Sequence, residues 1–182
     1  MKNILIGKKT VLYKVIPKDV ISFTKSIDDM DGYWRLGYWA WDLINDNWQE
    51  ILKQVIEDKM LVFWWARTKE GRGSRTIGFF WLNPVTEFWY NLEGLINDGF
   101  VAGLDKELKI GKYTYLEDAL RGLIDNNPIP RLGFISPPTQ TGILDLLKSI
   151  GFNKEGILKQ AIKTDNENYR DAVLYAKIRE VK

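Results

Sequence analysis

The feature that most constrains the fold is a helix that stops at a glycine and returns at once into a strand. Apolar residues recur at helical spacing up to Ile150, and Thr139 or Thr141 is placed to cap the start of this helix. Gly151 follows the last helical residue, where glycine commonly closes a helix in the left-handed conformation. Phe152 and then Glu155-Gly156 lead into a β-rich stretch. The segment therefore predicts a helix packed against a strand of the same domain.

The rest of the chain alternates in the same way between the two periodicities. A capping box at Asn47 and Glu50 opens one helix, and Thr114 with Glu117 opens another. The alternating or apolar patterns predict strands at 10–16, 60–67, 76–82, 131–136, 158–163 and 172–179, and a further helix at 18–25. Residues 88–98 fit a strand, a short helix or a loop. The short apolar run at 100–104 predicts the central strand.

This order of elements predicts an α/β fold, in which helices between strands cover both faces of one sheet. We expect a three-layer sandwich whose mixed central sheet has six or seven strands and is flanked by about four helices. A chain of 182 residues is long enough for one domain with a full core, so residues 1–182 are assigned to a single domain.

Three stretches resemble the GNAT superfamily of acyl-CoA N-acyltransferases, in particular its ribosomal-protein N-acetyltransferase branch. They are the helix and strand of 137–158, the last strand within 168–176, and the Thr76-Ile77-Gly78-Phe79 strand opening. The resemblance implies a GNAT-like sandwich, acetyl-CoA as cofactor, and transfer of an acetyl group to an amine. The acceptor would be a protein N-terminus or a small amine.

The resemblance also implies a CoA pyrophosphate site in the loop before the helix that Thr114 opens, where the family has Arg/Gln-x-x-Gly-x-Gly/Ala. Backbone N–H groups of such a loop cradle phosphate, and glycine lets them approach it. The cofactor-binding residues expected here are Lys109, Ile110, Gly111, Lys112, Tyr113 and Thr114. The motif is degenerate. When the segment is aligned on Gly111, Leu108 stands at the leading Arg/Gln position and Tyr113 stands at the second small position. Aligned on the helix, Lys112 and Thr114 replace both glycines.

The following helix departs from the family at the positions that handle CoA. Gln140 takes the place of the family's Asn and is expected to touch the cofactor, while Ile143 replaces the usual Ser. The Tyr that often protonates the leaving thiolate would lie one turn further on, where Leu144, Leu146 and Leu147 stand. This apolar pattern favours a core role over proton transfer.

Acetyl transfer needs a base that removes a proton from the amine. With no His in the chain, carboxylates near the expected central strand are the candidates, and we assign the role to Glu93, Asp98 or Glu107, with Asp105 beside them. A carboxylate in such a position is more often a solvated surface group than a base.

All eight Trp residues lie between Trp34 and Trp89. Trp34, Trp39 and Trp41 lack clean periodicity and fall in the region that, by the resemblance, lines the acceptor groove. They predict an acceptor pocket or a protein-binding patch, with burial in the core as the alternative. Trp64 and Trp65 point to opposite faces of one strand, so at least one of them should be buried.

Composition excludes several classes of site. The chain has no Cys and no His, which rules out disulfides, thiolate catalysis, Cys- or His-ligated metal and a Ser-His-Asp triad, and we expect no metal. The net charge of +2 predicts no nucleic-acid partner. The longest apolar run, 60–66, is too short to cross a bilayer, and residues 1–9 lack a leader-type apolar core. We therefore expect a cytoplasmic protein.

Two functions from different classes fit these observations. The first is an N-acetyltransferase that uses acetyl-CoA. The alternative is a catalytically inactive GNAT-fold binding or structural module, for which the composition would suit a phage-encoded virion component. A small-ligand binder with an aromatic pocket is a third option, and fold alone does not choose among them.

Overall fold

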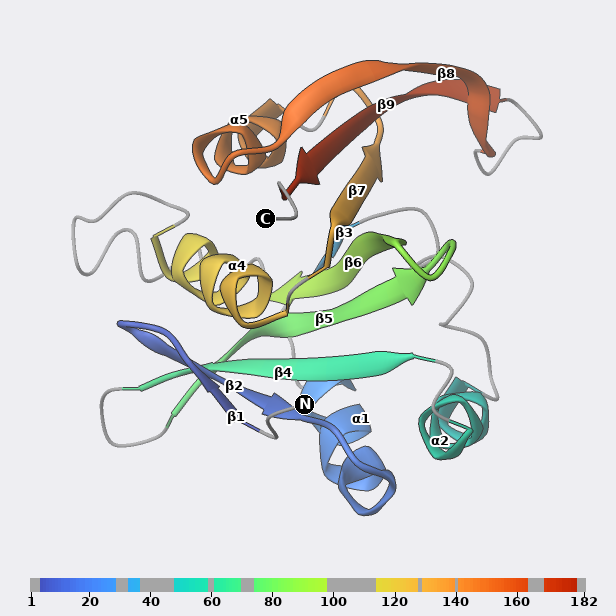
Figure 1. The fold of residues 1–182 in the computed structure, drawn as a ribbon. Coiled ribbons are helices and arrows are strands. Elements are labelled where there is room, and N and C mark those ends of the chain that lie inside the picture. Colours follow the sequence, from blue (N-terminus) through green and yellow to red (C-terminus); the bar gives the residue numbers. More distant parts are fainter. Residues whose placement is uncertain are drawn as a thin grey trace.

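The computed structural model describes residues 4–28, 33–36, 48–58, 61–69, 74–97, 114–127, 129–139, 141–163 and 169–179. These residues form a nine-stranded sheet in the order β1-β2-β4-β5-β6-β7-β9-β8, with β3 paired to β6. All pairs are antiparallel except β6 and β7, which run parallel. Helices cover both faces of the sheet, so the predicted α/β sandwich is confirmed (Figure 1).

The elements follow the predicted order closely. The first half contains β1 (Ile4–Ile6), β2 (Thr10–Lys14), the 3-10 helix η1 (Pro17–Asp19), α1 (Val20–Asp28), β3 (Tyr33–Leu36), α2 (Trp48–Glu57), β4 (Val62–Thr68), β5 (Thr76–Pro84) and β6 (Trp89–Asn97). The second half contains α4 (Thr114–Asn126), β7 (Arg131–Ser136), α5 (Thr141–Ser149), β8 (Asn153–Lys163) and β9 (Tyr169–Ile178).

The differences from the sequence prediction concern strands. The described residues hold nine strands rather than six or seven, because the short strands β1 and β3 were not predicted. The segment 88–98, which also fitted a helix or a loop, is strand β6 and lies at the centre of the sheet. The strand predicted at 100–104 lies outside the described residues.

Two apolar cores hold the three layers together. The larger core joins the sheet to α4 and α5, and the smaller joins β4 and β5 to α1 and α2 on the opposite face (Figure 1). Trp64 is fully buried in the larger core, while its neighbour Trp65 packs against the smaller one. The expectation that these two side chains face opposite sides of one strand is confirmed.

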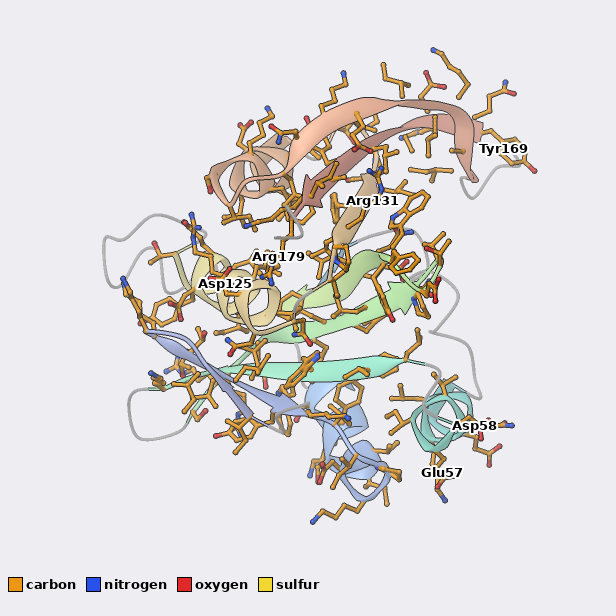
Figure 2. All side chains as sticks on the ribbon, in the orientation of Figure 1. Glu57, Asp58, Asp125, Arg131, Tyr169 and Arg179 are labelled. Atoms are coloured by element: carbon orange, nitrogen blue, oxygen red, sulfur yellow. The ribbon has the colours of Figure 1, made fainter. Side chains whose placement is uncertain are left out.

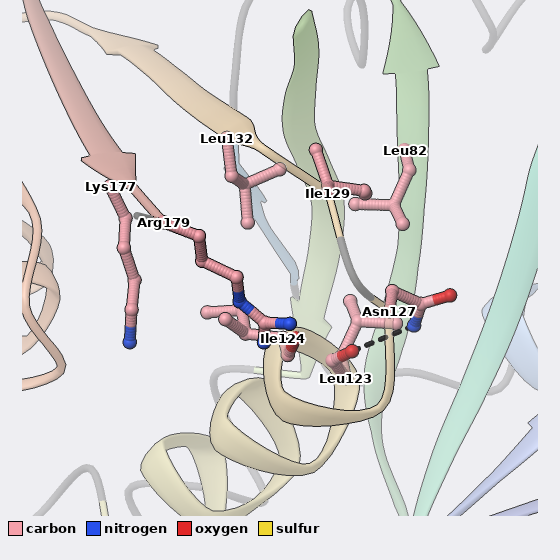
Figure 3. Close-up of a pocket in the computed structure, with 8 residues that line it drawn as sticks. All are labelled: Leu82, Leu123, Ile124, Asn127, Ile129, Leu132, Lys177 and Arg179. Atoms are coloured by element: carbon pink, nitrogen blue, oxygen red, sulfur yellow. Dashed lines mark hydrogen bonds between the residues drawn. The ribbon is translucent and has the colours of Figure 1, made fainter. Parts of the chain in front are cut away.

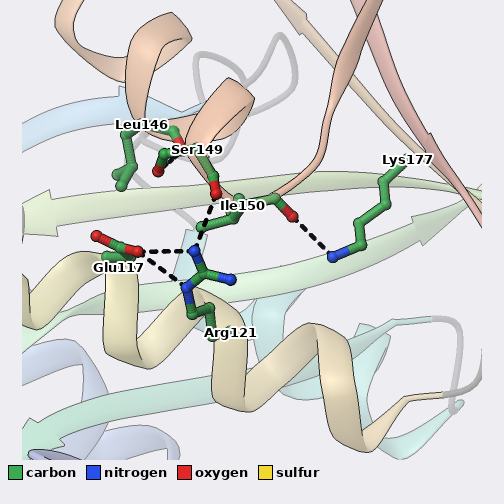
Figure 4. A network of polar contacts seen from close by, with 6 residues as sticks. All are labelled: Glu117, Arg121, Leu146, Ser149, Ile150 and Lys177. Carbon is green, nitrogen blue, oxygen red and sulfur yellow. Dashed lines mark hydrogen bonds and ion pairs between the residues drawn. The ribbon is translucent and has the colours of Figure 1, made fainter.

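The end of α5 has the geometry that the sequence predicts. Gly151 adopts a φ of +95°, in the left-handed region. The Phe152 N–H donates to the Leu147 carbonyl at 3.0 Å, which closes the helix in a Schellman motif. Arg121 of α4 donates to the Ser149 carbonyl at 2.9 Å and Lys177 of β9 to the Ile150 carbonyl at 2.7 Å (Figure 4). Both cations thus stabilise the negative end of α5.

A carboxylate ties α4 to the β1–β2 turn. Asp118 accepts hydrogen bonds at 2.9 Å from the backbone N–H groups of Lys8, Lys9 and Thr10, and one at 2.7 Å from the Thr10 hydroxyl. Burial raises the pKa of Asp118, but these four hydrogen bonds outweigh it and hold the pKa below its ordinary value. The contact fixes the edge of the sheet against the helix.

Strand β8 forms an edge of the sheet and is irregular. Its pairing with β9 shifts register between Lys154 and Gly156 and again between Leu158 and Ile162. Gln160, inside the second irregularity, has a φ of +49°, and its N–H donates to Asp171 at 3.1 Å. Ile157 and Leu158 are exposed on this strand. No helix among the described residues is long and apolar enough to span a membrane.

Candidate functional site

The two parallel strands of the sheet part at its centre. β6 and β7 pair only at Trp89 with Arg131, Tyr90 with Leu132, and Asn91 with Gly133. Beyond this point β7 continues beside β9, while β3 joins β6 from Gly94 onward. The stretch of β6 between Asn91 and Gly94 has no strand partner on its β7 side among the described residues.

Glu93 lies next to the point where β6 and β7 part. Side chains alternate along a strand, so Glu93 shares a face with Asn91 and is the first residue on that face beyond the last β6–β7 pair. The face is the one that packs against α1 and α2, because the neighbouring Leu92 belongs to the core on the α4 side. Only 2% of the Glu93 surface is exposed.

The environment of Glu93 favours its protonated form. Its Oε2 accepts a 2.9 Å hydrogen bond from the Trp81 indole N–H, and its Oε1 accepts one of 3.3 Å from the Asn83 amide. Phe63 packs against Trp81 with ring centroids 5.4 Å apart. Desolvation by these neighbours raises the pKa of Glu93 to about 7, although the two hydrogen bonds pull it down. A carboxylate with such a pKa can accept and release a proton near neutral pH.

Two asparagines lie beside Glu93 on the same face. Asn83 and Asn91 are directly opposite each other on β5 and β6. The Asn91 Oδ1 accepts a 3.2 Å hydrogen bond from the Trp89 indole N–H. This contact lies close above Gly133, where an added Cβ would stand 2.6 Å from the Asn91 oxygen and 2.7 Å from the Trp89 nitrogen. A side chain at Gly133 would therefore displace Asn91 or Trp89 from this contact.

An ion pair continues this row of polar groups toward the edge of the sheet. The Arg131 guanidinium lies 4.9 Å from the Trp89 ring centroid, within the range of a cation–π contact. It donates two hydrogen bonds to the Glu155 carboxylate, one of them from Nη1 to Oε1 at 2.9 Å. Figure 2 labels Arg131 on β7, between β6 and the β8–β9 hairpin. Glu155 sits at the first register shift of β8, and such bulges re-aim side chains.

The described residues test few of the predicted site positions. Glu93 is the one predicted carboxylate that they include, while Asp98, Asp105 and Glu107 lie outside them. Thr114 is the first residue of α4. The other predicted cofactor residues, 109–113 and Gln140, lie outside the described residues, as do Trp39 and Trp41. Trp34 pairs with Ile96 as part of β3, and its side chain is not described.

The α5 leucines and the helix opening at Thr114 are described. Leu144, Leu146 and Leu147 are buried in the larger core, as their pattern predicts, and none carries a proton donor. Glu117, expected to complete a capping box with Thr114, accepts a 2.9 Å hydrogen bond from the Arg121 side chain (Figure 4).

Sequence reasoning missed the partners of Glu93. The sequence prediction assigns no role to Trp81, Asn83 or Asn91. A signal was present: polar residues at 83, 91 and 93 interrupt two otherwise apolar strands. A polar side chain at an inward position of a central strand is unusual enough to mark a site.

The described residues also line two cavities away from Glu93. One, at the C-terminus of α4, measures about 10 Å³, room for no more than a water molecule (Figure 3). There Asn127 donates to the Leu123 carbonyl at 2.7 Å and Arg179 to that of Ile124, so its polar groups serve the helix end. The other is an open groove of about 670 Å³ between the β1–β2 turn and α4, lined by charges of both signs.

Comparisons with known proteins bear on the fold. No profile of a known protein family matches the sequence, and no curated protein matches it significantly. Among solved structures, ribosomal-protein-S5-alanine acetyltransferase from Vibrio fischeri shares 13% identity and a TM-score of 0.68, with 98% of each chain covered. RimL, a ribosomal L7/L12 alpha-N-protein acetyltransferase solved with coenzyme A, shares 14% identity and a TM-score of 0.67, covering 98% of this chain and 99% of its own.

A third similar structure is a chimera of the spermidine N-acetyltransferase SpeG from Vibrio cholerae and hSSAT. It shares 12% identity and a TM-score of 0.62, over 94% of this chain and 96% of its own. At this level of identity the likeness concerns the fold. The chain has the GNAT fold over nearly its whole length.

Proposed function

We propose that this protein is an N-acyltransferase that moves an acetyl group from acetyl-CoA to an amine, with Glu93 as the general base. The observation that carries the proposal is the position of Glu93. It is a buried carboxylate with a pKa near 7, and it lies where the two parallel strands of a GNAT fold separate. A structural role alone does not require an ionisable group in such a place.

The base acts on the acceptor before the acyl group moves. Free amines are mostly protonated at neutral pH, and a protonated amine has no lone pair for attack. Glu93 in its ionised form takes that proton, directly or through one water, and the neutral amine is then the nucleophile. Trp81 and Asn83 each donate to one carboxylate oxygen, which fixes the orientation of the ionised group.

The described residues offer two features that suit an acyl-CoA. The start of α4 at Thr114 provides a helix N-terminus, which attracts phosphate. The edge of β6 around Leu92 and Glu93 has no strand partner on its β7 side within the described ranges, and its backbone groups would suit the amide-bearing arm of the cofactor. When bound, acetyl-CoA would supply an acyl carbon activated as a thioester, and the C–S bond that breaks would release CoA as the thiol.

A titration with acetyl-CoA tests binding, and rate measurements test the role of Glu93. The thermal midpoint should rise as acetyl-CoA is added, because ligand binding to the folded state adds about 2.7 kcal/mol at a hundredfold its dissociation constant. Glu93→Gln should lower kcat by about 10²- to 10⁴-fold, as expected when a general base is lost, and leave the affinity for acetyl-CoA unchanged. Glu87→Gln, in the exposed turn between β5 and β6, is the matched control.

The inactive GNAT-fold module remains the alternative. No stabilisation at millimolar acetyl-CoA and no thiol release with any amine would favour it. Neither the fold nor the comparisons lend support to a phage or virion origin. For the active protein we propose acetyl-CoA as cofactor, a protein or small amine as acceptor, and action in the cytoplasm.

A further inference from the structure

We propose that strand β3 is a displaceable gate, which must leave β6 before a substrate can reach Glu93. The inference rests on the proposed function, because it concerns access to the base of that same site. With β3 paired to β6, the structure shows the closed form of the protein. Acetyl-CoA and β3 then compete for one edge of the sheet.

Glu93 is sealed in the closed form. Only 2% of its surface is exposed, and Trp81 and Asn83 already donate to its two oxygens. A general base works within about 3 Å of the proton that it takes, or through one water, so an amine has no approach to a group covered in this way. An element beside Glu93 must therefore move before the base can act.

The pairing pattern places β3 on the β7 side of β6. Gly94, Leu95 and Ile96 of β6 pair with β5 along one edge and with β3 at the same time. β3 must then occupy the opposite edge, which pairs with β7 at 89–91. The last residue of β3, Leu36, pairs with Gly94, the residue that follows Glu93. β3 thus takes up the edge that β7 leaves, and it ends beside the base.

β3 is also the least firmly held of the strands beside Glu93. β5 is paired along both of its edges, with β4 and with β6, and β7 is paired with both β6 and β9. Among the described residues β3 has four positions and pairs with β6 alone. Local opening costs least where few backbone hydrogen bonds must break. β3 is therefore the strand that can leave while the rest of the sheet stays intact.

Release of β3 also frees the backbone groups that a ligand needs. With β3 in place, the part of this edge that has no strand partner within the described ranges is Leu92 and Glu93, which together extend about 7 Å. Without β3 the open edge runs on to Asn97. A ligand arm that carries amides in series can add to such an edge by main-chain hydrogen bonds, as an extra strand does. The apparent affinity for acetyl-CoA is therefore reduced in proportion to the fraction of molecules that are open.

A disulfide that locks β3 to β6 tests the gate. The chain has no Cys, so Tyr33→Cys combined with Asn97→Cys can form one bridge within the chain. These two residues are directly paired at the end of β3 that is farther from Glu93. Paired Cα atoms of antiparallel strands lie about 4.5–5.5 Å apart, a separation that a disulfide spans. Ile4→Cys with Tyr13→Cys, a direct pair of exposed residues on β1 and β2, is the matched control lock.

Calorimetry with acetyl-CoA gives the first readout. The affinity of the β3 lock should fall at least tenfold when the bridge is oxidised, and it should return when a phosphine reductant opens the bridge. The control lock should bind acetyl-CoA equally in both states. Equal affinities for the oxidised and reduced β3 lock would overturn the gate, because acetyl-CoA would then bind while β3 is held on β6.

Chemical labelling of Glu93 gives a second readout that needs no ligand. A carbodiimide with an added amine modifies accessible carboxyl groups, and mass spectrometry locates them. We expect Glu93 to be labelled at least tenfold more slowly in the oxidised β3 lock than in the reduced form, and the exposed Glu87 to be labelled equally in both. Equal labelling of Glu93 in the two states would overturn the gate.

Hydrogen exchange of the parent protein tests the same idea without substitutions. The slowest amides of β3 should exchange at least tenfold faster than the slowest amides of β5, since β3 opens alone. Equal protection of the two strands would overturn the gate.

The readouts separate this inference from the proposed function. Glu93 labelling that depends on the β3 lock, in a protein that does not bind acetyl-CoA in any form, would keep the gate and remove the transferase. Transfer to an amine at equal rates by the oxidised and reduced β3 lock would remove the gate and keep the transferase.

Discussion

The indole N–H of Trp81 donates to the Glu93 carboxylate at 2.9 Å, across the β5–β6 pair in which the two residues are directly opposite. Trp81 both buries the carboxylate and stabilises its charge. These two effects act on the Glu93 pKa in opposite directions, with burial the larger. A substitution that removes the indole N–H of Trp81 should therefore change the pKa of Glu93.

Trp81→Phe should shift the acid limb of the pH–rate profile to higher pH. Phenylalanine keeps most of the apolar cover and removes the hydrogen bond that lowers the Glu93 pKa. The profile of kcat/KM against pH reports this pKa in the free enzyme. Trp65→Phe, on β4, removes an indole that donates to Thr76 instead and serves as the control. An acid limb that moves to lower pH would contradict the assignment.

The free energy of unfolding should fall as the pH rises from 4.5 to 7. The folded protein holds the Glu93 proton with a pKa of about 7, whereas the ordinary value is 4.5. The folded state thus binds more protons in this window, so the stabilisation present at low pH is lost as Glu93 ionises. A pKa shift of this size changes the free energy of unfolding by about 3 kcal/mol across the window.

Urea unfolding at several pH values, compared between the parent and Glu93→Gln, isolates this contribution. The variant has no titrating group at position 93. The difference in the free energy of unfolding between the parent and the variant should therefore fall as the pH rises through this window. A difference that stays constant across the window would mean that Glu93 is already ionised in the folded protein.

Gly151→Val should destabilise the protein by about 1–2 kcal/mol, the cost of left-handed geometry for a residue with a Cβ. The φ of +95° carries this cost, because a Cβ at Gly151 would meet only Lys177 at an ordinary 3.5 Å. Gly156→Val is the control, since nothing lies within 4 Å of its added Cβ and its φ is not left-handed. Equal thermal midpoints for the two variants would argue against strain at Gly151.

Asp118→Asn should lower the free energy of unfolding by about 1–3 kcal/mol, which is the penalty of leaving polar groups without partners. An amide has one acceptor oxygen, whereas the carboxylate now serves three backbone N–H groups and the Thr10 hydroxyl. Asp125→Asn, exposed on the same helix, should change stability little. Hydrogen exchange of the β1–β2 turn gives a local readout, and unchanged protection there would contradict the expected role.

The sequence was most informative where local chemistry decides the structure. The end of α5 could be predicted from Gly151 alone, and the strand at Arg131–Ser136 has the predicted bounds. Strand β1 escaped prediction because it has three residues and a single inward side chain, Leu5, too few to establish a period. β6 was ambiguous because Asn91 and Glu93 interrupt its apolar pattern.

The candidate site also depends on contacts that local sequence does not reveal. Glu93 was among four carboxylates that the sequence could not rank. What distinguishes it is pairing between strands: Trp81 and Asn83 lie ten or more positions earlier and become neighbours only through the β5–β6 register. The raised pKa of Glu93 likewise comes from tertiary burial, which no local pattern reveals.

The irregular pairing of β8 bears on how this protein behaves at high concentration. An eleven-residue strand at a sheet edge, with Ile157 and Leu158 exposed, is a template on which other chains can add strands and start aggregates. The two register shifts and the left-handed Gln160 break that template into short pieces, and Lys159 and Asp171 place charge beside it. Restoring a regular ladder at the second shift alone, between Leu158 and Ile162, would therefore favour fibril-like assembly while leaving Glu155 beside Arg131.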